Sequence, residues 1–265
     1  MEKRDKLAVF DIDGTFYRDS LNIEVIDRLA EAGLIPSERM EGLNKLRQAW
    51  KNRDGTYTDY IALLVRLMED GLLNGIPDVD YRTIADKVVD DLGDRVYVFP
   101  RELHCALQNA GYATVALSGS PEYAVKRFAE RWRFSDIVAT RFGVDADGCL
   151  ISQKSHIDVP AERKGEEFKR LCARDGADPY KTVAIGDTIG DAAMLQEAEF
   201  PIAFNPDQRL DGLAWSKSWP VVVERKDTVI LVRRDRRCSL ETMLPREVAL
   251  ELRTRLTAYG ITVRP

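Results

Sequence analysis

Apolar positions in three parts of the chain form short, uninterrupted runs, and each run ends at polar residues. The run "LAVF" is followed by Asp11, "ATVAL" by Ser118, and "TVAI" by Gly186 and Asp187. The last two runs lead into residues that favour the start of a helix. Short apolar runs that alternate with helices are typical of a parallel sheet with helices on its faces. The pattern therefore predicts an α/β fold.

Between the first two runs, apolar residues instead recur three and four positions apart. This spacing predicts amphipathic helices, and Pro, Gly and Asp residues separate them. Because the alternation of strand and helix stops here, we expect a helical insertion over residues 18–96, within a core formed by residues 1–17 and 97–265. The predicted helices of the insertion are 20–33, 38–50, 58–71 and 80–93.

The rest of the chain predicts further elements of the core. Residues 99–112 have the pattern of a helix that precedes the second strand. Residues 136–152 predict a strand and a hairpin, with Asp147-Gly148 as the tight turn. In the tail, residues 219–237 predict one or two strands at an edge of the sheet, and the basic residues that end this segment are interpreted as a solvated edge.

Composition and charge narrow the class of protein. A chain of 265 residues, 45% of them hydrophobic and 31% charged, has enough apolar material for one large domain or two modest ones. The net charge of −5 argues against nucleic-acid partners, which select basic surfaces. Neither the charged first ten residues nor any later stretch resembles a signal peptide or a membrane span. We therefore expect a cytoplasmic protein without nucleic-acid or membrane partners.

The cysteines and histidines do not form a zinc-binding pattern. The chain has four cysteines far apart in sequence, no Cys-x-x-Cys pair, and two histidines. We expect the cysteines to be reduced and mostly buried thiols. His104 is interpreted as a helix side chain and His156 as a loop residue.

Acidic residues follow the first predicted strand, at the end where open parallel sheets bind ligands. Asp11 and Asp13 lie two positions apart in "DIDGT". As structure, Asp-Gly-Thr is a turn and Asp13 a local cap. As chemistry, one carboxylate is a nucleophile and a Mg²⁺ ligand, and the cation offsets the repulsion between the two acids.

The stretch "LSGSPEY" after the second strand also has two interpretations. Ser120 before Pro121 is a good N-cap for the helix that follows. The same helix start, with Ser118 and Gly119 facing it, is also suited to bind phosphate through free backbone amides.

The last two stretches are Lys164 in "AERKGEEF" and the acids of "AIGDTIGDAAML". Lys164 alone is typical of an exposed residue near a helix start. Asp191 can cap the helix from Ala192, whereas Asp187 and Asp191 together can complete an oxygen-rich pocket for a hard cation.

In combination, these stretches resemble the haloacid dehalogenase (HAD) superfamily of phosphotransferases. The resemblance rests on "DIDGT", Ser118, Lys164 and "GDTIGD", which occur in this order, and it covers residues 6–205. It extends to the phosphoserine-phosphatase-like subclass, in which a helical cap is inserted between the first and second motifs. It implies a Rossmann-like parallel sheet flanked by helices, with an inserted α-helical cap. P-loop and dinucleotide-binding glycine motifs are absent from the sequence.

The resemblance implies a catalytic role for each matching residue. Asp11 would attack the phosphoryl phosphorus and form an aspartyl-phosphate intermediate. Asp13 would protonate the leaving oxygen and then take a proton from water. The phosphoryl oxygens would be held by Ser118, the Gly119 amide and Lys164.

The resemblance also implies a Mg²⁺ site. Its ligands would be Asp11, the backbone carbonyl of Asp13, and Asp187. Asp191 would be a further ligand, or it would orient Lys164 or a metal-bound water. Because Mg²⁺ usually keeps several waters, two or three protein oxygens are enough.

Substrate selection would belong to the cap, residues 18–96. Phosphoserine phosphatases typically have Asp-x-Asp-Ser-Thr and a glutamate nine positions after the nucleophile, where this chain has Gly14 and Ser20. They also have a second glycine where this chain has Ser120. These departures argue against phosphoserine itself, and they make Asp19 and Ser20 the candidates for substrate contact.

The leading hypothesis is a Mg²⁺-dependent hydrolase of a small soluble phosphomonoester, with phospho-amino acids and phospho-amino alcohols favoured. One alternative is a phosphotransferase that passes the phosphoryl group to an alcohol, and another is a phosphate-ester-binding module without turnover. Asp13 argues against the binding module, which needs no acid–base residue. In the cap, Trp50, Tyr57 and Tyr60 either line the pocket or pack in its core.

Overall fold

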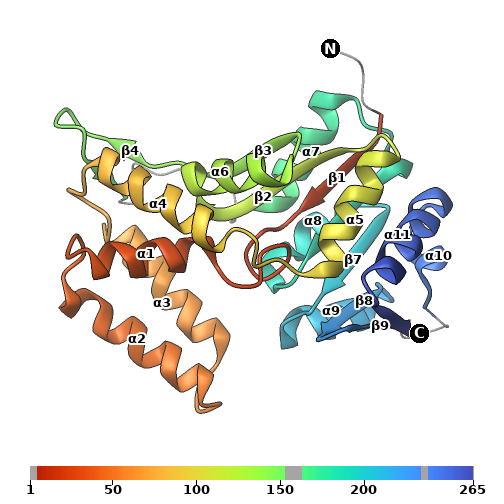
Figure 1. Ribbon diagram of the computed structural model, residues 1–265, viewed down its shortest axis with the longest axis horizontal. Helices are drawn as coiled ribbons and strands as arrows, with labels where there is room; N and C mark the ends of the chain where they lie inside the picture. The colour runs from red at the N-terminus through yellow and green to blue at the C-terminus, as the bar shows by residue number, and fades with distance from the viewer. Residues whose placement is uncertain (1–4, 153–162, 234–237, 265) are drawn as a thin grey trace.

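The computed structural model describes residues 5–152, 163–233 and 238–264. Figure 1 shows an α/β core with helices on both faces of one sheet, and a group of helices, coloured red to yellow, beside the core. The predicted α/β fold with a helical insertion is therefore confirmed.

The central sheet has eight strands in the order β10-β9-β8-β7-β6-β1-β2-β3. Neighbouring strands are parallel except β8 and β9, which are antiparallel. Strand β1 lies between β6 and β2, and all its residues are buried because helices cover both faces of the sheet. The strands are β1 Leu7–Phe10, β2 Ala113–Pro121, β3 Asp136–Thr140, β6 Thr182–Gly186, β7 Phe200–Phe204, β8 Val221–Arg225, β9 Thr228–Val232 and β10 Thr262–Arg264.

Alternating residues of the strands build a separate core on each face. Phe10 points to the face covered by α5, α6, α10 and α11, whereas Val9 points to the face covered by α7, α8 and α9. The helices are α5 Val98–Asn109, α6 Glu122–Trp132, α7 Lys164–Asp175, α8 Ala192–Glu197, α9 Gln208–Lys217, α10 Leu240–Met243 and α11 Arg246–Ala258, with 3-10 turns η3 Pro179–Lys181 and η4 Ile189–Asp191.

The insertion consists of α1 to α4, and its predicted helices are confirmed with ends that differ by at most two residues. Helix α1 begins after Ser20, whose hydroxyl accepts a hydrogen bond from the Ile23 amide, and α3 begins after Thr56, which caps it in the same way. Helix α4 packs on α6 of the core. The helices are α1 Leu21–Glu31, α2 Ser37–Lys51, α3 Tyr57–Glu69 and α4 Asp78–Leu92.

The predicted hairpin is formed by β4 Gly143–Val144 and β5 Leu150–Ile151. Its turn includes Gly148, whose φ of +79° favours glycine. The hairpin also touches the insertion, because the Leu150 amide donates to the Ile76 carbonyl at 2.8 Å.

In the tail, the strand that forms the edge of the sheet differs from the prediction. Strands β8 and β9 form the predicted pair, but β10 lies outside β9, so neither is the edge strand. Strand β10 and helices α10 and α11 were not predicted from the sequence. Strand β10 has only three residues and pairs with a strand more than thirty positions away in sequence. Of the basic segment 233–237, the structure describes Arg233, which donates to the Ser218 carbonyl at 2.6 Å; residues 234–237 lie outside the described ranges.

The expectations for cysteine and histidine hold in part. Cys238 is buried, but Cys105, Cys149 and Cys172 are half-buried free thiols, so the expectation of mostly buried cysteines was wrong. They lie on partly exposed sides of α5 and α7 and beside the hairpin turn. His104 is a buried side chain of α5, as predicted, and His156 lies outside the described residues. None of the helices in the described ranges has the length and apolar character that crossing a membrane requires.

Candidate active site

The polar residues singled out from the sequence meet at one edge of the sheet. Asp11 follows β1 directly, and its amide continues the ladder by donating to the Ile185 carbonyl of β6 at 2.9 Å. Ser118 lies near the end of β2, and Asp187 follows β6. Because β1 pairs in parallel with both β2 and β6, these strand ends lie side by side.

Lys164 lies at the centre of this group and is buried, so its interpretation as a surface residue was wrong. It is the first residue of α7, and its Nζ donates to Asp11 Oδ1 at 2.5 Å and to Asp191 Oδ1 at 2.6 Å. Asp11 and Asp191 are buried as well. A buried cation between two buried carboxylates offsets part of their cost of burial.

Asp191 orients Lys164 and the loop after β6. Its Oδ2 accepts the amides of Asp187 at 3.0 Å and Thr188 at 2.9 Å, and Lys164 occupies its Oδ1. Its side chain therefore does not cap α8, as one interpretation had it, and instead forms a capping box with Thr188 at η4. The family's second role for this residue, orientation of the lysine, fits these contacts.

The carboxylates leave room for a cation on the side of Asp11 and Asp187. Ligand oxygens of Asp11, Asp187 and Asp191 lie within 4.8 Å of one another, and Asp11 Oδ2 is buried without a hydrogen-bond partner among the described residues. Thr15 Oγ1 donates to Asp187 Oδ1 at 3.2 Å, which leaves Oδ2 of that side chain for other partners. An unpartnered buried carboxylate oxygen beside a second carboxylate suits a hard cation, so the residues present fit Mg²⁺.

Gly14 makes the space in which Asp187 lies. Its φ of +84° is in the left-handed region, and a Cβ at this position would collide with the Asp187 carboxylate. The serine that phosphoserine phosphatases typically have at this position would meet the same carboxylate in this backbone conformation. The glycine that this chain has in place of that serine therefore fits the local geometry.

Burial and mutual repulsion raise the pKa values of Asp11 and Asp187. Burial raises the pKa of Asp11 to about 7, opposed by the positive charge of Lys164 and assisted by the negative charges of Asp191 and Asp13. The pKa of Asp187 lies well above its usual range, first because of burial and then because of the charge of Asp11. Without a cation, this cluster therefore favours bound protons, and a metal would displace them.

Asp13 is held by one group from the core and one from the insertion. Ser118 Oγ donates to Asp13 Oδ2 at 2.6 Å, and the amide of Leu21, the first residue of α1, donates to Asp13 Oδ1 at 2.6 Å. The N-terminal end of α1 thus faces a carboxylate, which the helix dipole favours. Asp13 is only partly buried, so its carboxyl group remains open to a ligand.

The residues after Ser118 complete the edge of the site. Ser120 does not cap α6, as the N-cap interpretation had it: Pro121 stands at that position, and Ser120 Oγ accepts the Asn22 amide of α1 at 3.2 Å. Gly119 is exposed, and its carbonyl accepts the Thr140 hydroxyl at 2.6 Å.

The two candidates for substrate contact have local roles in the structure. The Ser20 hydroxyl is occupied as the N-cap of α1. Asp19 is exposed, and its Oδ1 accepts the Ser20 amide at 3.1 Å. Their places at the start of α1 bring them near Asp13 in sequence.

The aromatic residues of the insertion form one cluster, of which Tyr57 approaches the site. The rings of Trp50 and Tyr57 are 5.1 Å apart, and Trp50 and Tyr60 are stacked at 6.1 Å. Tyr60 is buried within the insertion, whereas Trp50 and Tyr57 are half-buried. Burial, followed by the negative charges of Asp187, Asp13 and Asp11, raises the pKa of Tyr57 well above its usual range.

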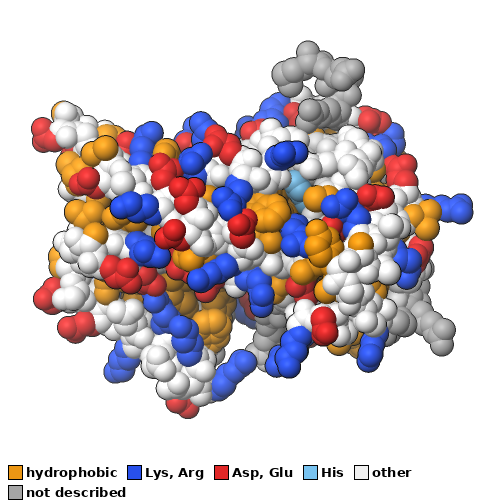
Figure 2. Space-filling view, in the orientation of Figure 1, with side chains coloured by type: hydrophobic (Ala, Val, Ile, Leu, Met, Phe, Trp, Pro, Cys, Tyr) orange, Lys and Arg blue, Asp and Glu red, His pale blue; other side chains and the backbone are white. Residues whose placement is uncertain are grey.

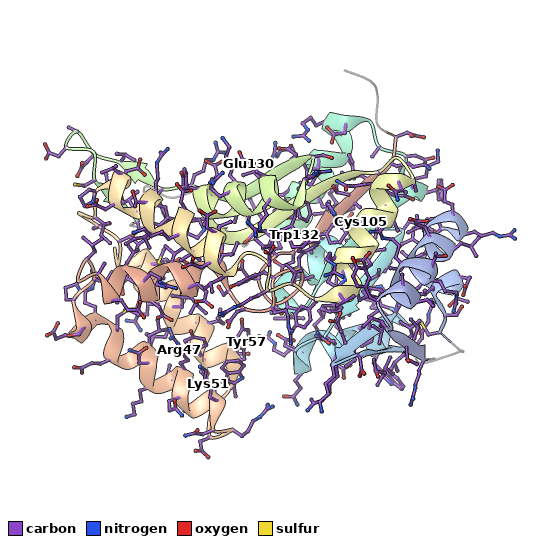
Figure 3. All side chains as sticks on the ribbon, in the orientation of Figure 1. Arg47, Lys51, Tyr57, Cys105, Glu130 and Trp132 are labelled. Atoms are coloured by element: carbon purple, nitrogen blue, oxygen red, sulfur yellow. The ribbon has the colours of Figure 1, made fainter. Side chains whose placement is uncertain are left out.

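The views of the molecule agree with this placement of Tyr57. Figure 2 shows hydrophobic side chains beside a hollow between the insertion and the core, with Lys and Arg side chains around it. Figure 3 places Tyr57 on the side of the insertion that faces the core, with Arg47 and Lys51 near it. The cluster therefore serves both interpretations: Tyr60 packs the insertion, and Tyr57 faces the hollow.

Three contributors to the site were not singled out as site residues from the sequence. Thr15 and Thr188 lie within the quoted "DIDGT" and "GDTIGD" segments, so their positions next to the acids were the available sign. The Leu21 amide gives no such sign, because any residue at the first position of α1 supplies the same backbone donor.

A mostly parallel sheet that gathers buried acids and one buried lysine at the ends of its central strands places this chain among the α/β proteins with an acidic site suited to a cation. A profile of the family described as haloacid dehalogenase-like hydrolase matches residues 8–196, a range that contains every residue of the site described above. The protein belongs to this family.

Individual relatives agree with the family match. The chain is 28% identical over 214 residues to a phosphoserine phosphatase of Idiomarina loihiensis, which covers 81% of this chain and 88% of the relative. It is also 28% identical over 211 residues to a phosphoserine phosphatase of Methanocaldococcus jannaschii, with 77% and 87% covered. A solved structure described as a phospho-aspartyl intermediate analogue of phosphoserine phosphatase has a similar fold, with a TM-score of 0.57, 24% identity, and coverage of 85% of this chain and 96% of the other.

Proposed function

We propose that this protein is a Mg²⁺-dependent phosphomonoester hydrolase in which Asp11 is the nucleophile. The observation that carries the proposal is the buried contact of Asp11 with Lys164, next to Asp187 and its neighbour Asp191. The family membership and the phosphoserine phosphatases among its relatives support this chemistry.

Hydrolysis proceeds in two displacements at phosphorus, the first by Asp11 and the second by water. A carboxylate oxygen of Asp11 forms a bond to phosphorus while the bond from phosphorus to the ester oxygen breaks, and Asp13 gives its proton to that oxygen. Asp13 then takes a proton from water as the water oxygen attacks phosphorus, which releases inorganic phosphate and restores Asp11. The contacts with Ser118 and the Leu21 amide keep the Asp13 carboxyl group beside Asp11.

The remaining residues hold the phosphoryl group. Lys164 places its ammonium next to Asp11, and the Ser118 hydroxyl and the Gly119 amide of β2 are the further groups that would offset charge on the phosphoryl oxygens during the transfer. Asp11, the backbone carbonyl of Asp13 and Asp187 would hold Mg²⁺, with Asp191 nearby, and the cation would supply further positive charge to offset that of the phosphoryl group.

The substrate is a small phosphate ester, and we favour a phospho-amino acid or phospho-amino alcohol. Residues 18–96 act as the cap that covers the site, and residues 1–17 and 97–265 form the core. The phosphoserine phosphatases among the relatives support an amino-acid-like leaving group. Gly14 and Ser20, which depart from that pattern, argue for a leaving group other than serine.

The test is phosphate release from a set of small phosphomonoesters, with Mg²⁺ and with EDTA. The set includes phosphoserine, phosphoethanolamine, phosphocholine, histidinol phosphate, sugar phosphates and nucleotides. Asp11→Asn removes the nucleophilic carboxylate, and we expect turnover to fall at least about 10³-fold while the protein stays folded.

Asp147→Asn is the matched control, because Asp147 lies exposed in the turn between β4 and β5, away from the site. Its turnover should equal that of the unaltered protein. Wild-type turnover in Asp11→Asn would refute the assignment of Asp11 as the nucleophile. Transfer of the phosphoryl group to an added amino alcohol instead of water would favour a transferase.

A further inference from the structure

Residues beyond the family match contact the start of α5, next to the two linkers that join the insertion to the core. The match ends at residue 196, whereas β8 lies at Val221–Arg225. The outgoing linker, Phe16 to Arg18, leads from the core into the insertion. The returning linker, Arg95 to Tyr97, leads back into the core and directly precedes α5. The linkers are paired with each other: the Arg18 amide donates to the Arg95 carbonyl at 2.8 Å, and the Tyr97 amide donates to the Phe16 carbonyl at 3.0 Å.

Glu224 of β8 contacts the start of α5, directly after the returning linker, through its carboxylate. Its two oxygens accept the amides of Val98 at 3.0 Å and Phe99 at 2.7 Å, the first two residues of α5. No side chain of the linker itself caps α5, since Tyr97 stands at the N-cap position. The cap of this helix is thus supplied by a strand more than a hundred residues away in sequence.

The outgoing linker also lies within the electrostatic reach of Glu224. The guanidinium of Arg18 lies 5.4 Å from the centre of the Tyr97 ring, and its positive charge acts on the Glu224 carboxyl group. Arg101, one turn along α5, is the second cation that acts on Glu224. The half-buried Glu224 carboxylate thus has one cation from the outgoing linker and one from α5 near it.

Glu224 is itself fixed to the loop that supports the metal-binding side of the site. Its amide donates to Asn205 Oδ1 at 2.9 Å, and Asn205, just after β7, donates its own amide to the Val222 carbonyl at 2.8 Å. Two residues on, the Asp207 amide donates to the Asp187 carbonyl at 2.8 Å. The chain of contacts runs from the acidic site to Glu224 and from there to the start of α5, next to the paired linkers.

We infer that Glu224 is a positioning residue. Through it the C-terminal extension, the part of the chain after residue 196, helps to set the place of the insertion over the acidic site. The insertion reaches that site through the Leu21 amide on Asp13, and the two paired linkers hold it in place together with the packing of α4 on α6. Without Glu224, the start of α5 loses its two acceptors, the paired linkers beside it are held less firmly, and the N-terminal end of α1 can shift from Asp13. This inference adds to the proposed function, on which its kinetic part rests.

The first test is hydrogen–deuterium exchange of Glu224→Ala, Glu224→Gln and the control Glu241→Ala. The control breaks the exposed ion pair of Glu241 with Arg253 elsewhere in the extension. For Glu224→Ala we expect exchange to increase roughly tenfold at residues 16–23 as well as at 98–99, because a lost helix cap weakens local structure by about that factor. Glu224→Gln replaces one of the two accepting oxygens with an amide nitrogen that only donates, so exchange at residues 98–99 and 16–23 should increase by less than in Glu224→Ala.

The second test is kinetic, on the best ester found for the wild type. Glu224→Ala should lower kcat about tenfold through the displaced Asp13, and Glu241→Ala should leave it unchanged. Exchange that increases only at residues 98–99, with kcat unaltered, would reduce Glu224 to an ordinary helix cap and overturn the inference. Because exchange needs no turnover, a protein without phosphatase activity would refute the proposed function and leave the exchange result to decide this inference.

Discussion

At the residue scale, the site depends on close approach between groups that ordinarily repel one another. Lys164 lies between Asp11 and Asp191, and Gly14 leaves the space that the Asp187 carboxylate fills. Each of these contacts is tight enough that one added carbon atom or one lost charge changes the geometry. Substitutions here are therefore expected to act on metal binding before they act on folding.

Gly14→Ala tests the role of this space. The left-handed φ costs an alanine about 1–2 kcal/mol, and the new Cβ also displaces the Asp187 carboxylate. We expect Mg²⁺ affinity, measured by calorimetry, to fall roughly 10- to 100-fold, as it does when the supports of a metal ligand are removed.

Gly148→Ala separates strain from collision. Gly148 has a similar φ of +79°, but a Cβ there meets nothing within 4 Å. This variant should lose a similar amount of stability to denaturant and bind Mg²⁺ as the wild type does. Equal Mg²⁺ affinities in the two variants would contradict the role of Gly14.

At the element scale, two helices of the insertion bring different groups to the site. Helix α1 presents its N-terminal amides to Asp13 and Ser120, while α3 begins at Tyr57, which faces the hollow. The bidentate pair of Arg47 with Asp27, at 2.7 and 2.8 Å, ties α2 to α1. These contacts give the insertion a fixed arrangement of one backbone end and one aromatic ring toward the core.

Tyr57→Ala tests whether the ring contacts the substrate or only packs the insertion. Loss of a half-buried ring that faces the leaving group should raise KM about tenfold with a smaller change in kcat. Steady-state kinetics on the preferred ester measures both constants.

Tyr180→Ala is the control, because Tyr180 is 77% exposed and lies in η3. It should leave KM unchanged. If Tyr57→Ala lowers the free energy of unfolding without raising KM, the ring is part of the packing with Trp50 alone.

At the scale of the whole molecule, one core joins the insertion, one face of the sheet and the C-terminal extension. His104 lies inside it, with the ring of Phe134 4.3 Å away and Thr114 Oγ1 3.1 Å from its Nε2. Burial lowers the pKa of His104 to about 4 from its ordinary value of 6.5. The imidazole is therefore neutral in the folded protein at neutral pH, and protonation favours the unfolded chain.

This burial predicts a loss of stability in acid. The contribution of neutral His104 is fully present above pH 6.5 and is lost as the pH falls toward 4, because the unfolded state binds the proton more tightly. By pH 5 the loss amounts to about 2 kcal/mol. The acids of the site titrate with the opposite sign, so the measurement is the difference in free energy of unfolding between the wild type and His104→Gln.

That difference should change by about 2 kcal/mol between pH 7 and pH 5. A difference that stays constant with pH would mean that His104 does not titrate on unfolding.

Features that depend on local pattern were predictable from the sequence. Strand β1 is an apolar run that ends at Asp11, and the helices of the insertion repeat apolar residues with the period of an α-helix. Because parallel strands end at a common edge, the meeting of Asp11, Ser118 and Asp187 also followed from the order of strands and acids.

Tertiary structure alone decided which partner each of these groups has. The burial of Lys164, the use of both Asp191 oxygens by protein donors, and the contact of Asp13 with the α1 amide all join segments far apart in the chain. Glu224 and Val98 are 126 positions apart, and no local pattern relates them. Local sequence determines which elements form, whereas such contacts depend on how complete elements pack, so only the folded chain specifies them.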